Sequence, residues 1–375
     1  MAPVHDVAIV GAGLLGLAAA RAVAAQGRDF IVLEQAAIGH DNGGSKGTCR
    51  IFRLGYPEPE YVAAARQARE LWHALEAETG RQILLPTPHL TFGPQLDGVH
   101  DAMRRAGAGC ELLTADEVAA RFPEIRVAGP ALLETESCVT AADEALAALA
   151  SAAGLVDPGD PAGHSGPSGA RLRTGVTVTG VADDGREVTL QTSAGPVTAR
   201  VVILATGAWT AGLLGDRARM AAEPRLEQVA YLAPATAPQQ PGRPTPIFIC
   251  YGDPSPYGLP VPASNLYKIG IHQSGVLVDP DAQTREPDQA MLGRLSEVAE
   301  RYLPGYVPEP VATERCIYDN TPDEDFIVDR VGNVVLGCGT SGHGFKFGPL
   351  FGEWLAGLAF GSAPPPSQRF GLARF

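Results

Sequence analysis

The sequence predicts an α/β protein of two domains, one built on a parallel β-α-β unit and one rich in mostly antiparallel strands. Three observations support this fold class. Residues 6–35 follow the order strand, glycine-rich turn, helix and strand. Residues 225–280 contain several short runs of alternating apolar residues. The chain has 375 residues, which is enough for two domains with sizeable cores.

Composition excludes several classes of partner. Hydrophobic residues make up 45% and charged residues 19%, which is ordinary for a globular protein. The net charge of −13 argues against nucleic acid or an anionic membrane as a partner. Apolar runs stay below the ~20 residues of a spanning helix, and we see no signal peptide. Six scattered cysteines without metal-site spacing fit a reduced, cytoplasmic protein without a metal site.

The first β-α-β unit carries a nucleotide-binding fingerprint. DVAIV is a short buried strand, GAGLLG a turn, LAAARAVAAQG a helix and DFIVLEQ a second strand. Gly11, Gly13 and Gly16 form G-x-G-x-x-G, which lets the backbone and the helix N-terminus approach a pyrophosphate. Glu34 ends the second strand, close to the offset of about 20 residues expected for a ribose-binding acid. An acid there favours FAD or NAD over NADP.

The rest of the chain alternates helices and strands. A helix is expected from Tyr61 onward, and Thr114 with Glu117 forms a capping-box pattern. The stretch 155–170, rich in Gly, Pro, Ser and Asp, is expected to be a flexible surface insertion. The other expected elements are helices within 95–123, a helix over 141–154, an antiparallel meander over 171–200, a buried strand over 201–209, strands over 225–280 and a helix over 286–305.

The expected nucleotide-binding domain is discontinuous, because strands typical of it occur at both ends and in the middle of the chain. We assign residues 1–84, 139–222 and 316–375 to this domain. Residues 85–138 and 223–315 then form the second, substrate-binding domain.

The stretch from Cys316 to Pro349 is where we expect the chemistry. TPDEDF is typical of a turn, FIVDR and NVVLGCG of strands, and LFGEWLAGLAF of a helix. A glycine-rich loop that enters a helix presents free N–H groups and the positive end of the helix dipole. His343 and Lys346 interrupt these glycines. An ordinary tight turn with a solvated lysine explains the stretch equally well.

Lysine is rare in this chain. Of the 29 Lys and Arg residues only Lys46, Lys268 and Lys346 are lysines, so 26 are arginines. A retained lysine suggests a site where a compact charge is needed and a guanidinium fork does not fit. Lys46 lies in a basic loop with Arg50 and Arg53, which is either a surface loop or an anion site. Lys268 lies in the alternating strand YKIGIH, where an exposed edge position is the alternative.

Several blocks in the same order resemble a known family. They are GAGLLG with Glu34, CRIFRLGYPEPEYV, YGLP, LYKIGIH, CIYDNTPDEDFIVD and SGHGFKF. Together they resemble the monomeric sarcosine oxidase and N-methyltryptophan oxidase group of the D-amino-acid oxidase (DAO) superfamily. The resemblance implies a glutathione-reductase-like FAD domain and a monomeric FAD-dependent oxidoreductase. It implies hydride transfer from an amine carboxylate to the flavin, an imine product, and reoxidation by O2 to hydrogen peroxide.

The resemblance also implies roles for individual residues. Cys316 matches the cysteine bonded through sulfur to the flavin, although a buried structural cysteine is the alternative. Lys268 matches a lysine near flavin N5 that promotes reaction with O2, and Arg50 an arginine on the same side. The substrate-binding residues matched are Arg53 and Lys346 for the carboxylate, His272 for the amine, and Tyr257 and His343 in the pocket.

The cofactor-binding set implied by the resemblance spans the chain. It comprises Gly11, Gly13, Leu14, Leu15, Gly16, Glu34, Gln35, Ser45, Arg50, Gly207, Trp209, Cys316, Gly342, Gly344, Phe345 and Lys346.

Two departures from the family pattern leave the substrate open. Cys49 stands where the family often has a small hydroxyl residue, and the proline-rich YGDPSPYGLPVPASN differs from the family's pocket segment. A tailoring oxidase or dehydrogenase of a larger or cyclic amine is therefore an alternative. A nicotinamide-binding protein without flavin and a non-catalytic binding module are the alternatives from other classes.

Overall fold

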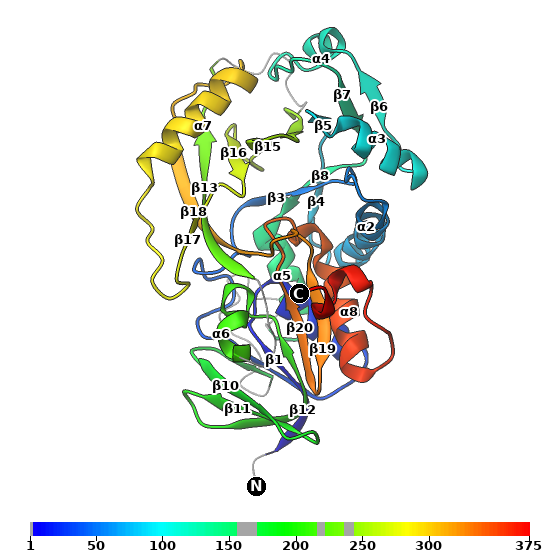
Figure 1. The fold of residues 1–375 in the computed structure, drawn as a ribbon, viewed down its shortest axis with the longest axis vertical. Helices are drawn as coiled ribbons and strands as arrows, with labels where there is room; N and C mark the ends of the chain where they lie inside the picture. Colours follow the sequence, from blue (N-terminus) through cyan, green and yellow to red (C-terminus); the bar gives the residue numbers. More distant parts are fainter. Residues whose placement is uncertain (1–2, 156–170, 216–221, 236–243) are drawn as a thin grey trace.

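A computed structural model describes residues 3–155, 171–215, 222–235 and 244–375. Apart from Leu155, the insertion expected over 155–170 lies outside the described residues. The molecule is elongated, with one large sheet at each end and the C-terminus near the middle (Figure 1). No helix in the described ranges is both long and apolar enough to cross a membrane.

The first sheet contains the expected β-α-β unit. β1 (Val4–Val10) lies between β2 (Phe30–Leu33) and β12 (Val197–Leu204), parallel to both, and α1 (Leu14–Ala25) connects β1 to β2. Within the described residues the sheet has eight strands, in the order β10-β11-β12-β1-β2-β9, with β20 pairing β12 and β19 pairing β20. The outer strands are β9 (Leu172–Arg173), β10 (Val178–Asp183), β11 (Val188–Thr192), β19 (Ile327–Val331) and β20 (Val334–Cys338).

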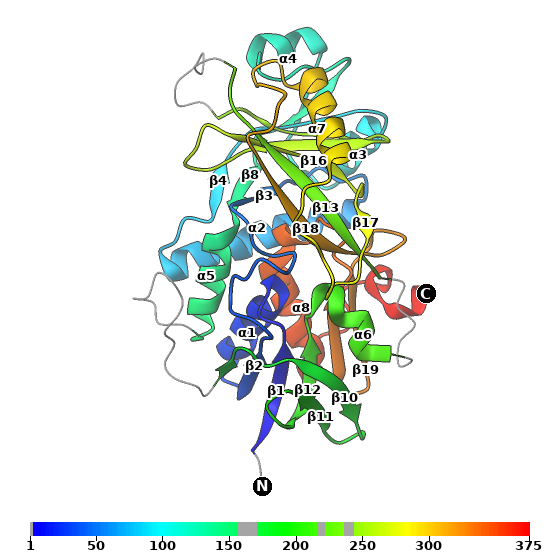
Figure 2. The same ribbon diagram turned by 90° about the vertical axis from the view of Figure 1, so that its left-hand side faces the viewer.

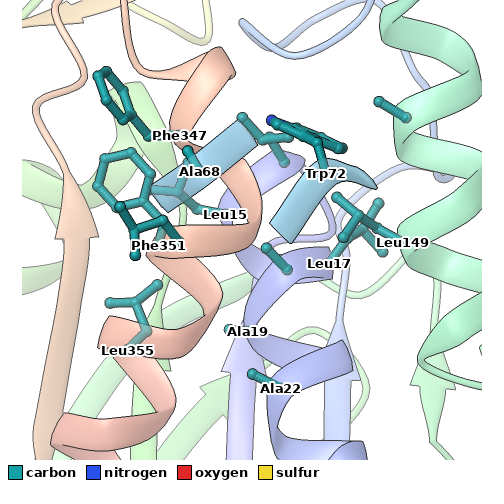
Figure 3. Close-up of a cluster of buried hydrophobic side chains, with 14 of the residues drawn as sticks. Leu15, Leu17, Ala19, Ala22, Ala68, Trp72, Leu149, Phe347, Phe351 and Leu355 are labelled. Carbon is teal, nitrogen blue, oxygen red and sulfur yellow. The ribbon is translucent and has the colours of Figure 1, made fainter. Parts of the chain in front are cut away.

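Four helices form the hydrophobic core beside this sheet. They are α1, α2 (Pro59–Thr79), α5 (Ala142–Ala152) and α8 (Gly348–Phe360), and Figure 3 shows side chains from all four in one buried cluster that includes Trp72. α8 lies so close to α1 that a Cβ added at Gly352 would come 2.4 Å from the carbonyl oxygen of Ala18. Trp72 is fully buried and donates its indole N–H to the carbonyl of Lys346 (2.7 Å). The core thereby fixes the backbone at Lys346.

The second sheet is strand-rich and antiparallel except where β14 pairs with β5. Its order among the described residues is β17-β13-β16-β15-β14-β5-β7-β6, with β18 on the other side of β13. Its helices are α3 (Leu96–Arg105), α4 (Ala115–Arg121) and α7 (Gln289–Tyr302). Its strands are β5 (His89–Phe92), β6 (Glu111–Leu113), β7 (Ala131–Glu134), β13 (Glu223–Leu232), β14 (Ile247–Cys250), β15 (Ser255–Pro260), β16 (Tyr267–His272), β17 (Val276–Leu277) and β18 (Ala312–Asn320).

A small third sheet lies between the two large ones (Figure 1). It consists of β3 (Cys49–Phe52), β4 (Leu84–Pro86) and β8 (Cys138–Ala141). The segment between β17 and α7 runs down beside α6 (Thr210–Leu214), as Figure 2 shows. The two large sheets are therefore joined both by the small sheet and by this segment.

The predicted two-part α/β fold is confirmed, with two local corrections. The stretch 95–123 is not helical throughout, because β6 separates α3 from α4. Three residues are too few to show the alternation that identifies a strand. The last strand of the predicted meander and the strand expected over 201–209 are one strand, β12, which pairs antiparallel with β11 and parallel with β1. The capping box at Thr114 and Glu117 is present.

Candidate active site

The first of two adjoining cavities lies at the carboxyl ends of β1, β2 and β12, where open α/β sheets bind ligands. It has a volume of about 460 Å³. Three of the expected cofactor residues do not line it. Gly16 packs beneath the glycine turn, and Cys316 and Lys346 line the neighbouring cavity. The expected residues that do line it are Gly11, Gly13, Leu14, Leu15, Glu34, Gln35, Ser45, Arg50, Gly207, Trp209, Gly342, Gly344 and Phe345.

The glycine turn at this cavity is held by backbone contacts. Gly11 has φ +97°, and a Cβ there would lie 2.5 Å from the carbonyl oxygen of Ala205. A Cβ at Gly16 would lie 1.9 Å from the carbonyl oxygen of Gly11. Side chains are excluded at both positions, so the turn places the N-terminus of α1 at the cavity. The N–H of Leu14 donates to Ser45 Oγ (3.0 Å).

Glu34 holds a buried carboxylate at the same edge of the sheet. It is 3% exposed, and its two oxygens accept the N–H groups of Ala12 (2.7 Å) and Ala36 (2.8 Å). The acid therefore fixes the glycine turn and also lines the cavity, where the fingerprint expects an acid for ribose hydroxyls. A backbone cradle without side chains, a helix N-terminus and this carboxylate fit an FAD-type dinucleotide.

The second cavity, of about 410 Å³, shares Arg50, Tyr318, Gly342 and Phe345 with the first. Its lining brings together every residue expected to act in catalysis or substrate binding, from β3, β15, β16, β18 and the segments after β3 and β20. These residues are Arg50, Arg53, Tyr257, Lys268, His272, His343 and Lys346, and Cys316 lies beside them.

Arg53 is a buried cation with free donor capacity. It is 7% exposed, and its Cζ lies 3.8 Å from the ring centroid of Tyr56 and 5.5 Å from that of Tyr251. Its Nη1 is buried and finds no hydrogen-bond partner in the described part of the chain. Burial favours a lower pKa for Arg53, but Tyr251, Tyr56 and Glu134 outweigh it and raise this pKa. The group is charged and lacks a complete set of partners, as a carboxylate site requires.

Lys346 starts a directed chain of hydrogen bonds. It is 4% exposed, and its Nζ donates to Tyr56 Oη (2.8 Å) and to the carbonyl of His343 (2.6 Å). His343 Nε2 contacts the carbonyl of Glu324 (2.9 Å), which can only accept, so Nε2 carries the proton. Tyr56 Oη then donates to the bare Nδ1 of His343 (3.1 Å).

Burial and neighbouring cations lower the pKa values of both titratable cations in this hydrogen-bond chain. The pKa of His343 is well below its usual value because of burial and then Lys346. The pKa of Lys346 is likewise well below its usual value because of burial and then Arg53. His343 is therefore neutral at pH 7, and an arriving anion would favour the charged form of Lys346.

Lys268 and Arg50 form the second cationic pair. Lys268 is 6% exposed on β16, and burial, followed by the charge of Arg50, lowers its pKa. Arg50 donates to the carbonyls of Cys49 (2.9 Å), Gly44 (3.0 Å) and Lys46 (2.6 Å), so it pins the loop beside the first cavity. Lys46 itself takes part through its carbonyl, and its side chain is exposed.

The remaining expected residues lie around the same cavity. Burial raises the pKa of the Cys316 thiol on β18. Burial also raises the pKa of Tyr257, which is hydrogen-bonded to Tyr318. His272 Nε2 lies 3.2 Å from Glu324 Oε2, and both residues line the cavity. No cluster of His, Cys, Asp or Glu that could hold a metal ion occurs in the described ranges.

Sequence reasoning missed several lining residues. Tyr318 could have been found, because it lies two residues after Cys316 in a strand and therefore faces the same side. Tyr56 was visible only as a neighbour of the basic loop. Tyr251 and Glu324 lie in stretches that the sequence singles out, YGDPSPYGLPVPASN and TPDEDF, but nothing there marks these two residues themselves. Glu134, which is buried and does not line the cavity, carries no signal in the sequence.

The chain is similar to known proteins over most of its length. The profile of the family described as "DAO: FAD dependent oxidoreductase" matches residues 6–358. The chain is 31% identical to monomeric sarcosine oxidase of Arthrobacter sp. (strain TE1826), covering 95% of this chain and 92% of the relative. It is 28% identical to N-methyl-L-tryptophan oxidase of Salmonella newport (strain SL254), covering 99% of each. The solved structure of NikD, an unusual amino acid oxidase essential for nikkomycin biosynthesis, superposes with a TM-score of 0.83 at 27% identity, covering 98% of this chain and 97% of NikD.

Proposed function

The chain belongs to the DAO family of FAD-dependent oxidoreductases, and on this premise we propose that it oxidises a secondary or cyclic amine that carries a carboxylate. Its relatives support an FAD-dependent amine oxidoreductase of the sarcosine oxidase kind. One observation carries the choice of substrate. Arg53 and Lys346 are buried together in the cavity that adjoins the nucleotide cavity, and Arg53 Nη1 has no partner among the described residues.

We assign the residues of the second cavity different roles in the reaction. When bound, FAD accepts a hydride equivalent from the C–H beside the amine nitrogen and passes the electrons to O2, which yields an imine and hydrogen peroxide. Arg53 and Lys346 hold the carboxylate, and this fixes the orientation of the amine. The amine must be neutral to lose hydride, and the surrounding cations lower its pKa. Water then hydrolyses the released imine.

Lys268 is proposed to serve the reaction with O2. A buried ammonium stabilises negative charge that develops on oxygen, and a low-dielectric site strengthens that effect. Lys268→Met should therefore slow reoxidation while substrate still reduces the enzyme. To test this, the holoenzyme is reduced with substrate under nitrogen and mixed with oxygenated buffer, and the rate of flavin reoxidation is measured. A rate equal to wild type would remove Lys268 from this role.

Cys316 is proposed to bond FAD through its sulfur. Two arrangements support this: Cys316 lines the second cavity, and Tyr318, two residues on, lines both cavities. Acid precipitation of the purified protein tests it. A yellow pellet that becomes colourless in Cys316→Ala supports the bond, whereas a yellow supernatant from wild type contradicts it.

A larger biosynthetic amine is the second candidate substrate. The proline-rich segment 251–265 favours it, because Tyr251, Gly252, Ser255, Tyr257 and Leu259 of this segment line the second cavity. The similarity to NikD points the same way. A panel of N-methyl amino acids, cyclic imino acids and bulkier amine carboxylates, read by peroxide formation, separates the two candidates. Flavin reduction without peroxide would instead identify a dehydrogenase.

A further inference from the structure

A buried acid lies behind the cationic wall of the second cavity. Glu134 ends β7, is 0% exposed, and does not line the cavity. Its Oε2 accepts the N–H groups of Leu54 (2.9 Å) and Gly55 (3.1 Å), the two residues after Arg53. A Cβ at Gly55 would lie 2.4 Å from Oε1. The carboxylate of Glu134 is thus in direct contact with the backbone that follows Arg53.

A second buried side chain fixes this carboxylate from the opposite side. His89 on β5 is 0% exposed and lies directly across the sheet from Glu134. Its Nδ1 donates to Glu134 Oε1 (2.8 Å), because a carboxylate only accepts. The pKa of Glu134 is lowered although burial opposes this, since His89, the N–H of Leu54 and then Arg53 favour the ionised form. Glu134 is therefore a fixed buried anion.

The charge of this anion matters to Arg53 because both groups are buried. A buried cation without a counter-charge is costly, and the flexible arginine side chain would otherwise turn toward water. Glu134 is among the groups that raise the pKa of Arg53. It bonds to the backbone of Leu54 and Gly55, which leaves the donor Nη1 without a partner among the described residues.

We propose that Glu134 is the positioning residue of the carboxylate site: it fixes the segment 53–55 and supplies the buried counter-charge that holds Arg53 ready for the substrate. The inference rests on the proposed function, since Arg53 must be what binds the carboxylate. Glu134 acts through Arg53 and touches no substrate. Its removal should consequently weaken carboxylate binding only when Arg53 is present.

Acetate is a suitable probe, because it carries the carboxylate and lacks the amine. The dissociation constant of acetate is measured by calorimetry on flavin-loaded wild type, Glu134→Gln, Arg53→Ala and the double variant. We expect Glu134→Gln to weaken acetate binding about tenfold, as for loss of a charge-assisted hydrogen bond. In the Arg53→Ala background the same change should cost less than about twofold.

Glu136→Gln is the matched control. Glu136 lies two residues away, is partly exposed, and pairs with Arg69, away from the cavity. It should leave acetate binding within about twofold of wild type. An equal loss for Glu134→Gln with and without Arg53 would overturn the inference and leave the proposed function intact. An unchanged affinity in Arg53→Ala would overturn the carboxylate site itself, and the inference with it.

Gly55→Ala keeps the test decisive if Glu134→Gln does not fold. Its new methyl group would meet Glu134 Oε1 at 2.4 Å and Val99 Cγ1 at 3.2 Å while every charge is retained. We expect weaker acetate binding in Gly55→Ala and partial recovery when Glu134→Asp, a shorter acid, is added. Wild-type affinity in Gly55→Ala would contradict the inference.

Discussion

The two cavities adjoin but are built by different means. The first cavity, proposed as the nucleotide cavity, depends mainly on backbone: a positive-φ glycine, a helix N-terminus and the N–H groups that bond to the side chain of Glu34. The second cavity, proposed as the substrate cavity, is made from charged and aromatic side chains that come from several strands and segments far apart in the chain. The first cavity depends on close contacts between backbone atoms. The second depends on buried charges that stabilise one another. The two should therefore fail in different ways.

The largest effect is expected where backbone meets backbone. In Gly16→Ala the new Cβ would lie 1.9 Å from the carbonyl oxygen of Gly11, so β1 and α1 must separate. Overpacking of this kind costs about 1–3 kcal/mol or more. We expect loss of bound flavin and a lower melting temperature, measured by visible absorbance per protein and by circular dichroism.

Gly293→Ala is the matched control for this experiment. Gly293 is a helical glycine on α7 that lines neither cavity, and a Cβ there would meet nothing within 4 Å. More flavin should be retained than in Gly16→Ala. Equal flavin content in the two variants would show that the contact with the Gly11 carbonyl is not what limits flavin binding.

Arg53→Ala should disable the substrate cavity without emptying the nucleotide cavity. Hydrogen bonds to charged groups contribute about 1.5–3 kcal/mol, so kcat/KM for an amine carboxylate should fall about 10- to 150-fold. Flavin content should stay at the wild-type level, because Arg53 does not line the first cavity. Steady-state kinetics with the acid and with its methyl ester measure the effect. An equal loss for both would show that the carboxylate is not what Arg53 recognises.

Lys346 gives the substrate cavity a pH dependence through its buried ammonium group. Its pKa is well below the usual value when no anion is bound, and a bound carboxylate raises it. Binding therefore takes up a proton between these two pKa values, and affinity falls as pH rises through that window, by at most about tenfold per pH unit.

Calorimetric titration with acetate in two buffers of different ionisation enthalpy measures this proton uptake. Lys346→Met should abolish the uptake and flatten the pH profile. Uptake that persists in Lys346→Met would assign the proton to another group, and uptake that is absent in wild type would show that Lys346 is already charged.

The contrast between the cavities also explains what the sequence could predict. The spacing of Gly11, Gly13 and Gly16 and the acid at Glu34 lie within one β-α-β unit, so local pattern suffices. Arg53, Lys268 and Lys346 were predicted as site residues from a family resemblance and, for the two lysines, from the scarcity of lysine in the chain. The structure places all three in the lining of one cavity.

The partners of these charges could not be read from the sequence. Glu134 lies far along the chain from Arg53, and Tyr56 acts as a link between Lys346 and His343 only after α2, β3 and the segment after β20 have packed together. Charge compensation in a buried site is a non-local property. Spacing in the sequence carries no record of it.

The smallest effect is expected from a charge pair outside both cavities. Arg285, in the segment between β17 and α7, pairs with Asp41 in the loop after β2, and both side chains are more than half exposed. The Arg285 hydrogen bond lowers the pKa of Asp41, yet solvent and salt screen such a pair. Arg285→Ala should leave flavin content, melting temperature and acetate affinity at wild-type values. Arg53→Ala is the same chemical change in a buried setting. If Arg285→Ala weakened acetate binding as much as Arg53→Ala does, or lost flavin, the effect of Arg53 could not be ascribed to its position in the cavity.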